Sequence, residues 1–174
     1  VWTHIAARYD SVLHVATIYF NGAFDTSSAA TVPDPNPSAD SVIVGTGFNG
    51  PFQGDLDNVR IWRGAQTSTE IRHYRFSSLG TSSGVYADLV LSLTFEDDDS
   101  AGDPFSVFDW SGRGNTPMNR GVTAVDMGAG PSVTQSYNEA VRFDGTNDYI
   151  AGTHASAVQP TTALTLEAWV HPLV

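Results

Sequence analysis

The chain has 174 residues, of which 19 are acidic and 8 are basic, and its formal net charge at pH 7 is −11. An apolar fraction of 41% is ordinary for a folded globular protein, and no stretch approaches the roughly 20 apolar residues that a membrane-spanning helix needs. Lysine and cysteine are absent, which excludes Schiff-base chemistry, disulfides, thiol catalysis and cysteine-bound zinc, while the lack of a basic stripe argues against nucleic-acid binding.

Strand patterns dominate the first part of the chain. Residues Trp2–Arg8 mix β-branched and aromatic side chains, and Val12–Phe20 alternates up to Asn21-Gly22, the dipeptide most typical of a tight hairpin. Two further strands are predicted at Val42–Val44 and, by renewed alternation, at Leu56–Trp62.

Between and after these strands lie a loop, a helix and a linker. Residues Asp25–Asp40 are rich in Ser, Pro, Ala and Asp and are predicted to form a surface loop. Thr67-Ser68-Thr69-Glu70 has the spacing of a capping box, which predicts a short helix near residues 68–77. The Ser/Gly-rich segment Gly80–Gly84 is predicted to be a linker.

The second part of the chain again predicts strands, at Asp88–Leu93, Ala140–Phe143 and Leu164–Val170. Asp144-Gly145 and Asn147-Asp148 have the chemistry of turns. Many short strands, polar turns and one short helix together predict an all-β, antiparallel β-sandwich.

Three motifs in the first part resemble a known family. They are the W-x-H-hydrophobic-A pattern of Trp2–Ala6, the Y-hydrophobic-N-G hairpin of Tyr19–Gly22 and the G-x-hydrophobic-D-x-V-R-I-W strand of Gly54–Trp62. These stretches resemble the closing half of a laminin-G-like, concanavalin A-like domain. The resemblance implies a jelly-roll β-sandwich with the capped helix after its penultimate strand.

The second part resembles the opening half of such a domain. Leu91–Glu96 looks like the family's opening strand and Asp109–Asn115 like its D-x-S-G-x-G-N loop. Ala140–Gly145 and Leu164–Val170 look like its A-x-x-F-D-G and hydrophobic-E-A-W-V strands.

The order of these halves departs from the family. A closing half at residues 1–78 precedes a linker at 79–86 and an opening half at 87–174, and the strands that normally join Val170 to Trp2 are missing. Because the chain begins at Val1, neither an initiator Met nor a signal peptide, it is expected to be processed or to be a window of something longer. The order of the halves leaves three alternatives: a window of a tandem array, a head-to-tail polymer, or a closed permutant with a shortened middle. Because half a sandwich leaves unpaired edges, we expect an array or polymer, with the two halves in different sandwiches and Gly80–Gly84 crossing between them.

Acidic residues in predicted turns suggest a calcium site. The run Asp97–Asp103 starts like a calcium-binding loop, but Phe108 stands where the closing Glu belongs. A better candidate for Ca²⁺ is a set of oxygen ligands in tight turns, for which the alternative is hydrogen bonding within Asx turns. The set is Asp109, Asn115, Asp144, Asn147 and Asp148.

Aromatic residues in loops suggest carbohydrate contacts. Trp110 lies in a Gly-rich loop, and Phe48 and Phe52 surround a turn. Trp2 and Trp169 are expected to be core aromatics at matching strand positions. A catalytic carboxylate pair is not credible, since Ala101 stands where a partner of Glu96 would be needed, so we predict that the chain is not an enzyme.

The sequence therefore predicts a secreted or cell-surface structural or adhesion module, part of a tandem array or head-to-tail fibre, whose partners are neighbouring copies or adjacent repeats. The alternative is a calcium-dependent carbohydrate-binding module of a secreted glycan-active protein. A glycan ligand belongs to that alternative, while no nucleic acid and no membrane span are expected.

Overall fold

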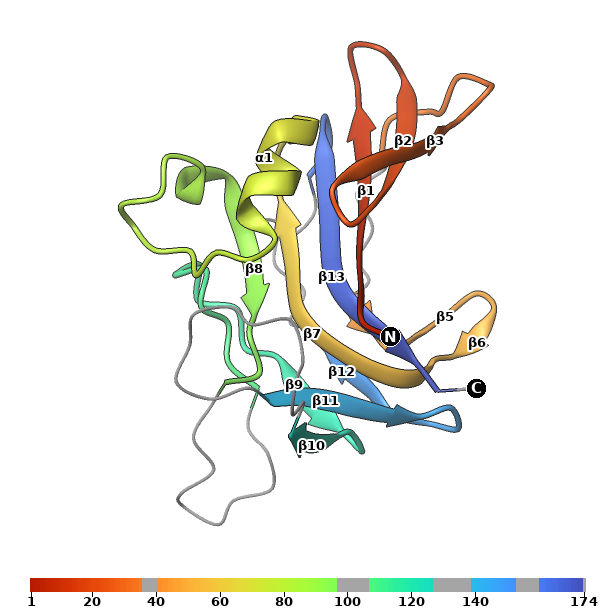
Figure 1. The fold of residues 1–174 in the computed structure, drawn as a ribbon, viewed down its shortest axis with the longest axis vertical. Helices are drawn as coiled ribbons and strands as arrows, with labels where there is room; N and C mark the ends of the chain where they lie inside the picture. Colours follow the sequence, from red (N-terminus) through yellow and green to blue (C-terminus); the bar gives the residue numbers. More distant parts are fainter. Residues whose placement is uncertain (36–40, 97–106, 127–138, 153–159, 174) are drawn as a thin grey trace.

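A large antiparallel sheet, sheet A, organises the fold of the computed structural model, which describes residues 1–35, 41–96, 107–126, 139–152 and 160–173. Its strands are β1 (Thr3–Asp10), β2 (Val15–Phe20), β3 (Ala23–Ser27), β7 (Gln53–Trp62), β8 (Leu89–Leu93), β10 (Thr123–Asp126), β11 (Glu139–Asp144) and β13 (Leu164–Pro172). They lie in the order β10-β11-β7-β13-β1-β2-β3. Strand β8 pairs with the same edge of β7 as β11 does, but further along the strand (Figure 1).

A second, much smaller sheet, sheet B, has the order β4-β12-β9. Its strands are β4 (Ile43–Val44), β12 (Tyr149–Ala151) and β9 (Met118–Arg120), while β5 (Thr46–Gly47) and β6 (Gly50–Pro51) form a separate hairpin. The helix α1 (Ser68–Tyr74) and the single turn η1 (Tyr86–Asp88) lie between β7 and β8 in the chain. These antiparallel sheets with one α-helix agree with a concanavalin-like β-sandwich, as the sequence predicts.

The main core lies between the inner face of sheet A and sheet B. Leu56 before the irregularity at Asn58, and Val59 and Ile61 after it, belong to the main core together with Phe143 of β11 and Ile150 of β12. Burying each such side chain stabilises the fold by roughly 1.5–3 kcal/mol. A smaller cluster on the outer face of sheet A joins α1 to β1 and β2 through Ile71, Ala6 and Tyr19.

The hairpin predicted at Asn21-Gly22 is confirmed. Phe20 pairs with Ala23, so the turn has two residues, and both have positive φ, 52° at Asn21 and 77° at Gly22. Positive φ at both positions is the geometry that matches the twist of the flanking strands, and Asn and Gly adopt it most readily.

The capping box is also confirmed: the Thr67 side chain accepts from the Glu70 N–H, and the Glu70 carboxylate accepts from the Thr67 N–H. The helix ends at Tyr74 rather than near residue 77. The Arg60 guanidinium donates to the carbonyls of Tyr74 and Ser77, at 2.9 and 2.8 Å. These contacts satisfy carbonyls at the C-terminal end of the helix, where the last carbonyls have no intrahelical partner.

Other boundaries differ more. Residues 11–14 form a turn, so β2 starts at Val15. The first three residues of the predicted loop Asp25–Asp40 belong to the edge strand β3. The short strands β5, β6, β9 and β10 escaped prediction because two to four residues carry little periodicity. The run Asp97–Asp103 lies outside the described residues.

The prediction that the two halves lie in different sandwiches is wrong. Strand β7 pairs with β13 on one edge and with both β11 and β8 on the other, and β1 pairs with β13. Each central strand of the first half therefore has neighbours from the second half. After β7 the chain forms α1 and then returns as β8, which pairs with β7 and has Leu89 opposite Trp62. Both halves thus share one sheet, while the boundaries at residues 78 and 87 stay a prediction.

Candidate functional sites

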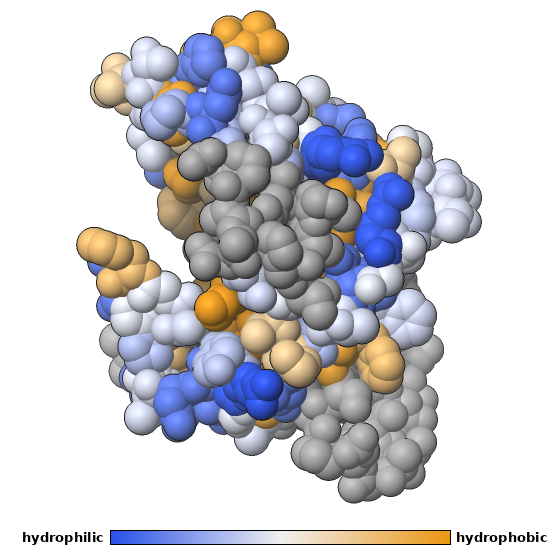
Figure 2. Space-filling view, turned by 180° about the vertical axis from the view of Figure 1, so that it is seen from behind, coloured by the Kyte–Doolittle hydropathy of each residue, from blue (hydrophilic) through white to orange (hydrophobic). Residues whose placement is uncertain are grey.

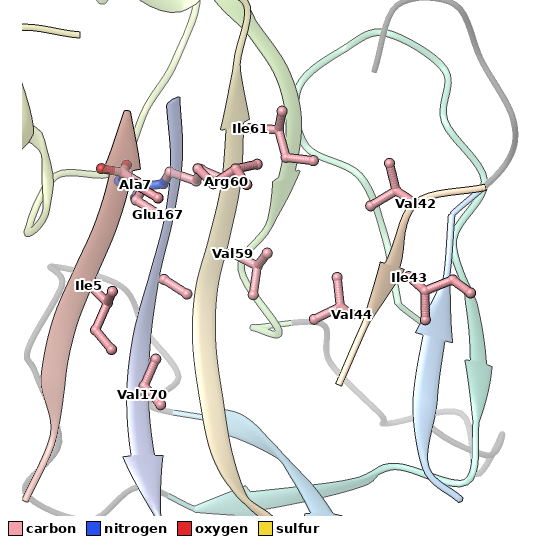
Figure 3. A pocket seen from close by; sticks show the side chains of 12 residues that line it. Ile5, Ala7, Val42, Ile43, Val44, Val59, Arg60, Ile61, Glu167 and Val170 are labelled. Carbon is pink, nitrogen blue, oxygen red and sulfur yellow. Dashed lines mark hydrogen bonds and ion pairs between the residues drawn. The ribbon is translucent and has the colours of Figure 1, made fainter. Parts of the chain in front are cut away.

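An open apolar groove of about 320 Å³ lies between the inner face of sheet A and strand β4 (Figure 3). Aliphatic side chains from β1, β13 and β7 form one wall, and those at and next to β4 form the other. The lining residues are Ile5, Ala7, Val42, Ile43, Val44, Val59, Arg60, Ile61, Leu166, Glu167, Ala168 and Val170. Arg60 and Glu167 border the groove only along their strands, because their charged ends lie on the outer face of sheet A, where they pair 3.2 Å apart and nearly fully buried.

The groove is open because the two sheets differ in width. Among the described residues, sheet B has three strands against the eight of sheet A, and β4 is its last described strand. One edge of β4 pairs with β12, and no described strand pairs with the other. As a result, the side chains of Leu166 and Ile43 are 41% and 49% exposed. The view from behind shows apolar side chains at the molecular surface beside hydrophilic ones (Figure 2).

A polar row crosses four strands on the opposite, outer face of sheet A. The Asp55 carboxylate of β7 accepts two hydrogen bonds from the Arg142 guanidinium of β11, at 2.7 and 3.0 Å. The Oδ2 atom of Asp55 also lies 3.2 Å from Nδ1 of His171 in β13. The ring of Trp2, before β1, lies 5.4 Å from the His171 ring. Burial raises the pKa of Asp55, but the bonds to Arg142 and His171 outweigh it and lower the pKa below its usual value.

This row lies away from α1. Helix α1 covers one end of the central strands, while both chain termini lie at the other end, where the row is (Figure 1). The Arg142 side chain is 46% exposed and that of His171 is 30% exposed, whereas Asp55 is buried beneath them. A buried carboxylate thus orients two accessible polar groups beside an aromatic ring.

Further along the same face, charged groups are fully buried under α1. Arg60 pairs with Glu167, and Glu167 lies 3.5 Å from His4 Nε2. Burial raises the pKa of Glu167, but the contacts with His4 and Arg60 prevail and lower it. Burial also raises the pKa of Asp57, here to about 7, because the hydrogen bonds from Asn58 and the charge of Arg60 only partly offset it.

The predicted calcium ligands fall into two groups. In the first, the Asp109 carboxylate accepts from the backbone N–H groups of Ser92 and Ser111, from the Ser111 hydroxyl and from the Asn115 amide, at 2.6–2.9 Å. Four donors therefore already surround its two oxygens, which is the arrangement expected of an Asx turn that organises a loop.

The second group lies in the turn between β11 and β12. Asp148 is buried and accepts from the Asp144 N–H at 2.9 Å, and Asp144 accepts from the Thr146 N–H at 2.7 Å. Asp144 and Asn147 are exposed, so their oxygens are accessible to a cation. Within the described part of the chain, no three His, Asp or Glu side chains lie close enough to hold a metal ion. Calcium binding stays a prediction, and this turn is the place to test it.

The predicted carbohydrate-contacting aromatics lie in three settings. Trp110 is 57% exposed, and its carbonyl accepts from the Tyr86 hydroxyl. Phe48 is fully exposed in the β5–β6 hairpin, whereas Phe52 is half-buried and packs against Phe143 at the edge of the core. Phe52 thus contributes to packing, and Trp110 and Phe48 remain accessible.

The two tryptophans expected in the core behave differently. Trp169 is buried, as predicted, although it lies on the outer face, where its Nε1–H donates to the Arg75 carbonyl. Trp2 is only half-buried and belongs to neither core cluster. Its link to His171, Asp55 and Arg142 escaped the sequence because these residues are distant in the chain, and only strand register aligns them.

Comparison with known proteins finds a similarity for the first part of the chain. Residues 1–72 match a laminin-G family model described as the concanavalin A-like lectin/glucanases superfamily. No curated protein and no solved structure matches the chain. Among the described residues, no helix is long and apolar enough to cross a membrane. The matched segment runs from the N-terminus into α1 and includes β1 and β7, the strands at the centre of sheet A. Residues 1–72 of this chain are therefore similar to the concanavalin A-like lectin/glucanase superfamily.

Proposed function

We propose that the chain is an extracellular, non-catalytic structural or adhesion module whose smaller sheet is completed by a strand of a neighbouring copy or adjacent repeat. The observation that carries the proposal is the outer edge of β4, beside the apolar groove, with which no described strand pairs. This is the lectin-like or adhesion type of module that the family match suggests.

The chemistry of the groove favours a β-strand over other occupants. An unpaired strand edge presents backbone N–H and C=O groups that another strand satisfies directly, and pockets below it take alternate side chains. Here the pockets are lined by aliphatic residues such as Ile5, Leu166 and Val170. The charged ends of Arg60 and Glu167 are used in their buried pair, so an apolar, extended segment fits best.

Self-association tests this proposal. Sedimentation velocity at rising protein concentration should show oligomers of the wild-type chain, and Leu166→Arg should abolish them because it places a charge in the groove. Since each chain carries a net charge of −11, association should strengthen when salt screens the repulsion between copies.

The matched control is Phe48→Arg, which adds the same charge at a fully exposed position outside the groove and should leave association unchanged. A wild-type chain that stays monomeric at all concentrations and at raised salt would contradict the proposal, as would equal loss of association in both variants.

The burial of two neighbouring carboxylates on β7 supports a non-catalytic role for the chain. Asp55 and Asp57 lie two residues apart on the same face of β7, but Asp57 is fully buried and Asp55 is engaged by Arg142 and His171. Hydrolysis needs two carboxyl groups that both reach the scissile bond. We therefore expect no cleavage of glycans by the purified chain.

A second candidate function is calcium-dependent carbohydrate binding, and the polar row on the outer face favours it. Trp2 offers a ring for stacking, and Arg142 and His171 offer polar groups held in place by Asp55. Neighbouring strands are about 4.8 Å apart, so a row across four strands spans about 14 Å, the scale of a short oligosaccharide. The Arg142 charge is balanced by Asp55 and the chain is acidic, so the sugar is neutral.

Calorimetry with neutral oligosaccharides, with and without chelator, tests this second candidate. Trp2→Ala should weaken binding about tenfold, the equivalent of roughly 1.4 kcal/mol, because it removes the stacking surface. Trp110→Ala and Phe48→Ala are the matched comparisons: binding lost in these variants and kept in Trp2→Ala would move the site to the sequence-predicted aromatics. Absence of any binding would reject the candidate function.

Calcium is proposed to bind at the turn that holds Asp144, Asn147 and Asp148 and to stabilise it. At a calcium concentration 100 times Kd, stability should rise by about 2.7 kcal/mol, measured as a higher Tm. Asp144→Asn should remove this rise, whereas Asp109→Asn, in the carboxylate that already accepts four hydrogen bonds, should keep it. A melting curve unchanged by calcium or chelator would rule calcium out.

A further inference from the structure

The segment that follows α1 is held against sheet A by a small number of polar anchors. Arg60 donates to the carbonyls of Tyr74 and Ser77, and Trp169 Nε1–H donates to the Arg75 carbonyl at 2.9 Å. The Phe76 ring lies 5.1 Å from the Trp169 ring. Three hydrogen bonds and one ring contact thus close residues 74–77 over the outer face.

Asp57 lies next to these anchors in a chemically unusual setting. It is fully buried and sits opposite Trp169 in the register of β7 and β13. Its Oδ2 accepts from the Asn58 amide at 2.7 Å, but its Oδ1 has no hydrogen-bond partner among the described residues. An ionised carboxylate in such a place is costly, whereas a neutral carboxyl group is tolerated.

Arg60 is the cation nearest in sequence that could compensate a negative charge on Asp57, but its terminal nitrogens already bind other groups. Its two terminal nitrogens bond to Glu167, Asn58, Tyr74 and Ser77, while its buried Nε, like Asp57 Oδ1, lacks a partner within the described ranges. Asn58, at φ 50° in an irregular part of β7, bridges the two side chains, with its amide nitrogen on Asp57 and its amide oxygen on Arg60. A shift of Arg60 toward Asp57 would therefore loosen its bonds to the segment after α1.

We propose that Asp57 is a proton-controlled latch: its neutral form keeps residues 74–77 closed over sheet A, and its ionised form favours their release. Asp57 is charged and solvated in the open state and neutral in the closed state. Its pKa of about 7 in the closed state supports this direction. The charged or titratable groups on the elements of this region are Asp55 and Arg60 on β7, Glu167 and His171 on β13, His4 on β1, and His73, Tyr74 and Arg75 in and after α1.

The pH window follows from the sign of the shift. Because the pKa of Asp57 is raised in the closed state, closure is strongest below the ordinary carboxyl pKa of about 4 and weakens as the pH rises toward 7. Above that value the effect is complete and no further change is expected. The pKa of Glu167 is shifted downward, so its titration lies below most of this window.

Hydrogen exchange of the backbone amides of residues 75–78 in the intact chain tests the latch. After correction for intrinsic exchange rates, protection should fall by up to about tenfold per pH unit between about pH 5 and pH 7 and then level off. Asp57→Asn, which keeps the shape but cannot ionise, should abolish this fall. Asp55→Asn, on the same face and strand, should keep it.

A second measurement covers the case in which Asp57→Asn does not fold. The ¹³C resonance of the Asp57 carboxyl group in the wild-type chain should titrate in step with the loss of protection at residues 75–78. Protection that does not change over this range, or that falls equally in Asp57→Asn, would overturn the proposal, the latter assigning the effect to another group. A carboxyl group that titrates near its ordinary pKa would overturn it as well.

Discussion

At the scale of single residues, the outer face of sheet A depends on a buried ion pair. Glu167 and Arg60 are each almost fully buried and pair across β13 and β7. Since breaking a buried pair leaves an uncompensated charge, Glu167→Gln should cost about 3–5 kcal/mol of unfolding free energy at neutral pH. Urea denaturation measures this cost. Asp25→Asn, on the exposed strand β3, should cost far less.

The same carboxylate gives a pH dependence of known sign. The pKa of Glu167 is lowered in the folded chain, so its contribution to stability is present above the unfolded carboxyl pKa of about 4.3 and is lost as the pH falls below it. The difference in unfolding free energy between wild type and Glu167→Gln should therefore shrink in acid. A constant difference down to low pH would contradict this assignment.

At the scale of elements, the β2–β3 hairpin and α1 support each other through Gly22. Gly22 has φ 77°, and a Cβ placed there would lie 2.8 Å from the Arg72 Cα in α1. Gly22→Ala should therefore destabilise the chain by about 1–2 kcal/mol from the backbone conformation alone, with the clash adding to it. Thermal unfolding measures the change.

Gly47 in β5 is the matched control for this substitution. A Cβ at Gly47 meets nothing within 4 Å, and its φ is not in the positive region. Gly47→Ala should accordingly leave Tm nearly unchanged. Equal effects of the two substitutions would show that the contact between hairpin and helix does not carry the stability assigned to it.

At the scale of the whole molecule, the two halves of the chain form one cooperative sheet. Strand β7 from the first half has β13, β11 and β8 from the second half as its neighbours. A polypeptide of residues 1–78 alone would expose both edges of β7 and the apolar side of Val59 and Ile61. Each half is thus expected to be unfolded or aggregated by itself.

Mixing the two halves should restore the fold. Polypeptides of residues 1–78 and 85–174 should regain near-ultraviolet circular dichroism and buried tryptophan fluorescence only when combined. The junction between them, Gly80–Gly84, carries no strand and no described tertiary pairing beyond local turns. Independent, cooperative unfolding of the isolated first half would contradict the shared sheet and favour separate sandwiches.

What the sequence by itself determined is local. The Asn21-Gly22 turn, the Thr67–Glu70 capping box and the alternation of Leu56–Trp62 follow from backbone preferences and side-chain periodicity within a few residues. These signals, with the family's motifs, were sufficient for a β-sandwich with one helix. They also suggested which aromatic and acidic residues lie in turns, because turn formation depends mainly on residues that are adjacent in the sequence.

The tertiary structure decided which strands are neighbours, and with that the candidate sites. A strand pattern states which face of a strand is apolar but not which distant strand pairs with it, so the sharing of sheet A by both halves could not be predicted. The groove beside β4 lies where, in the described part of the chain, sheet B has fewer strands than sheet A. The row of Arg142, Asp55, His171 and Trp2 exists because register aligns four distant positions. The same register places the buried Asp57 opposite Trp169.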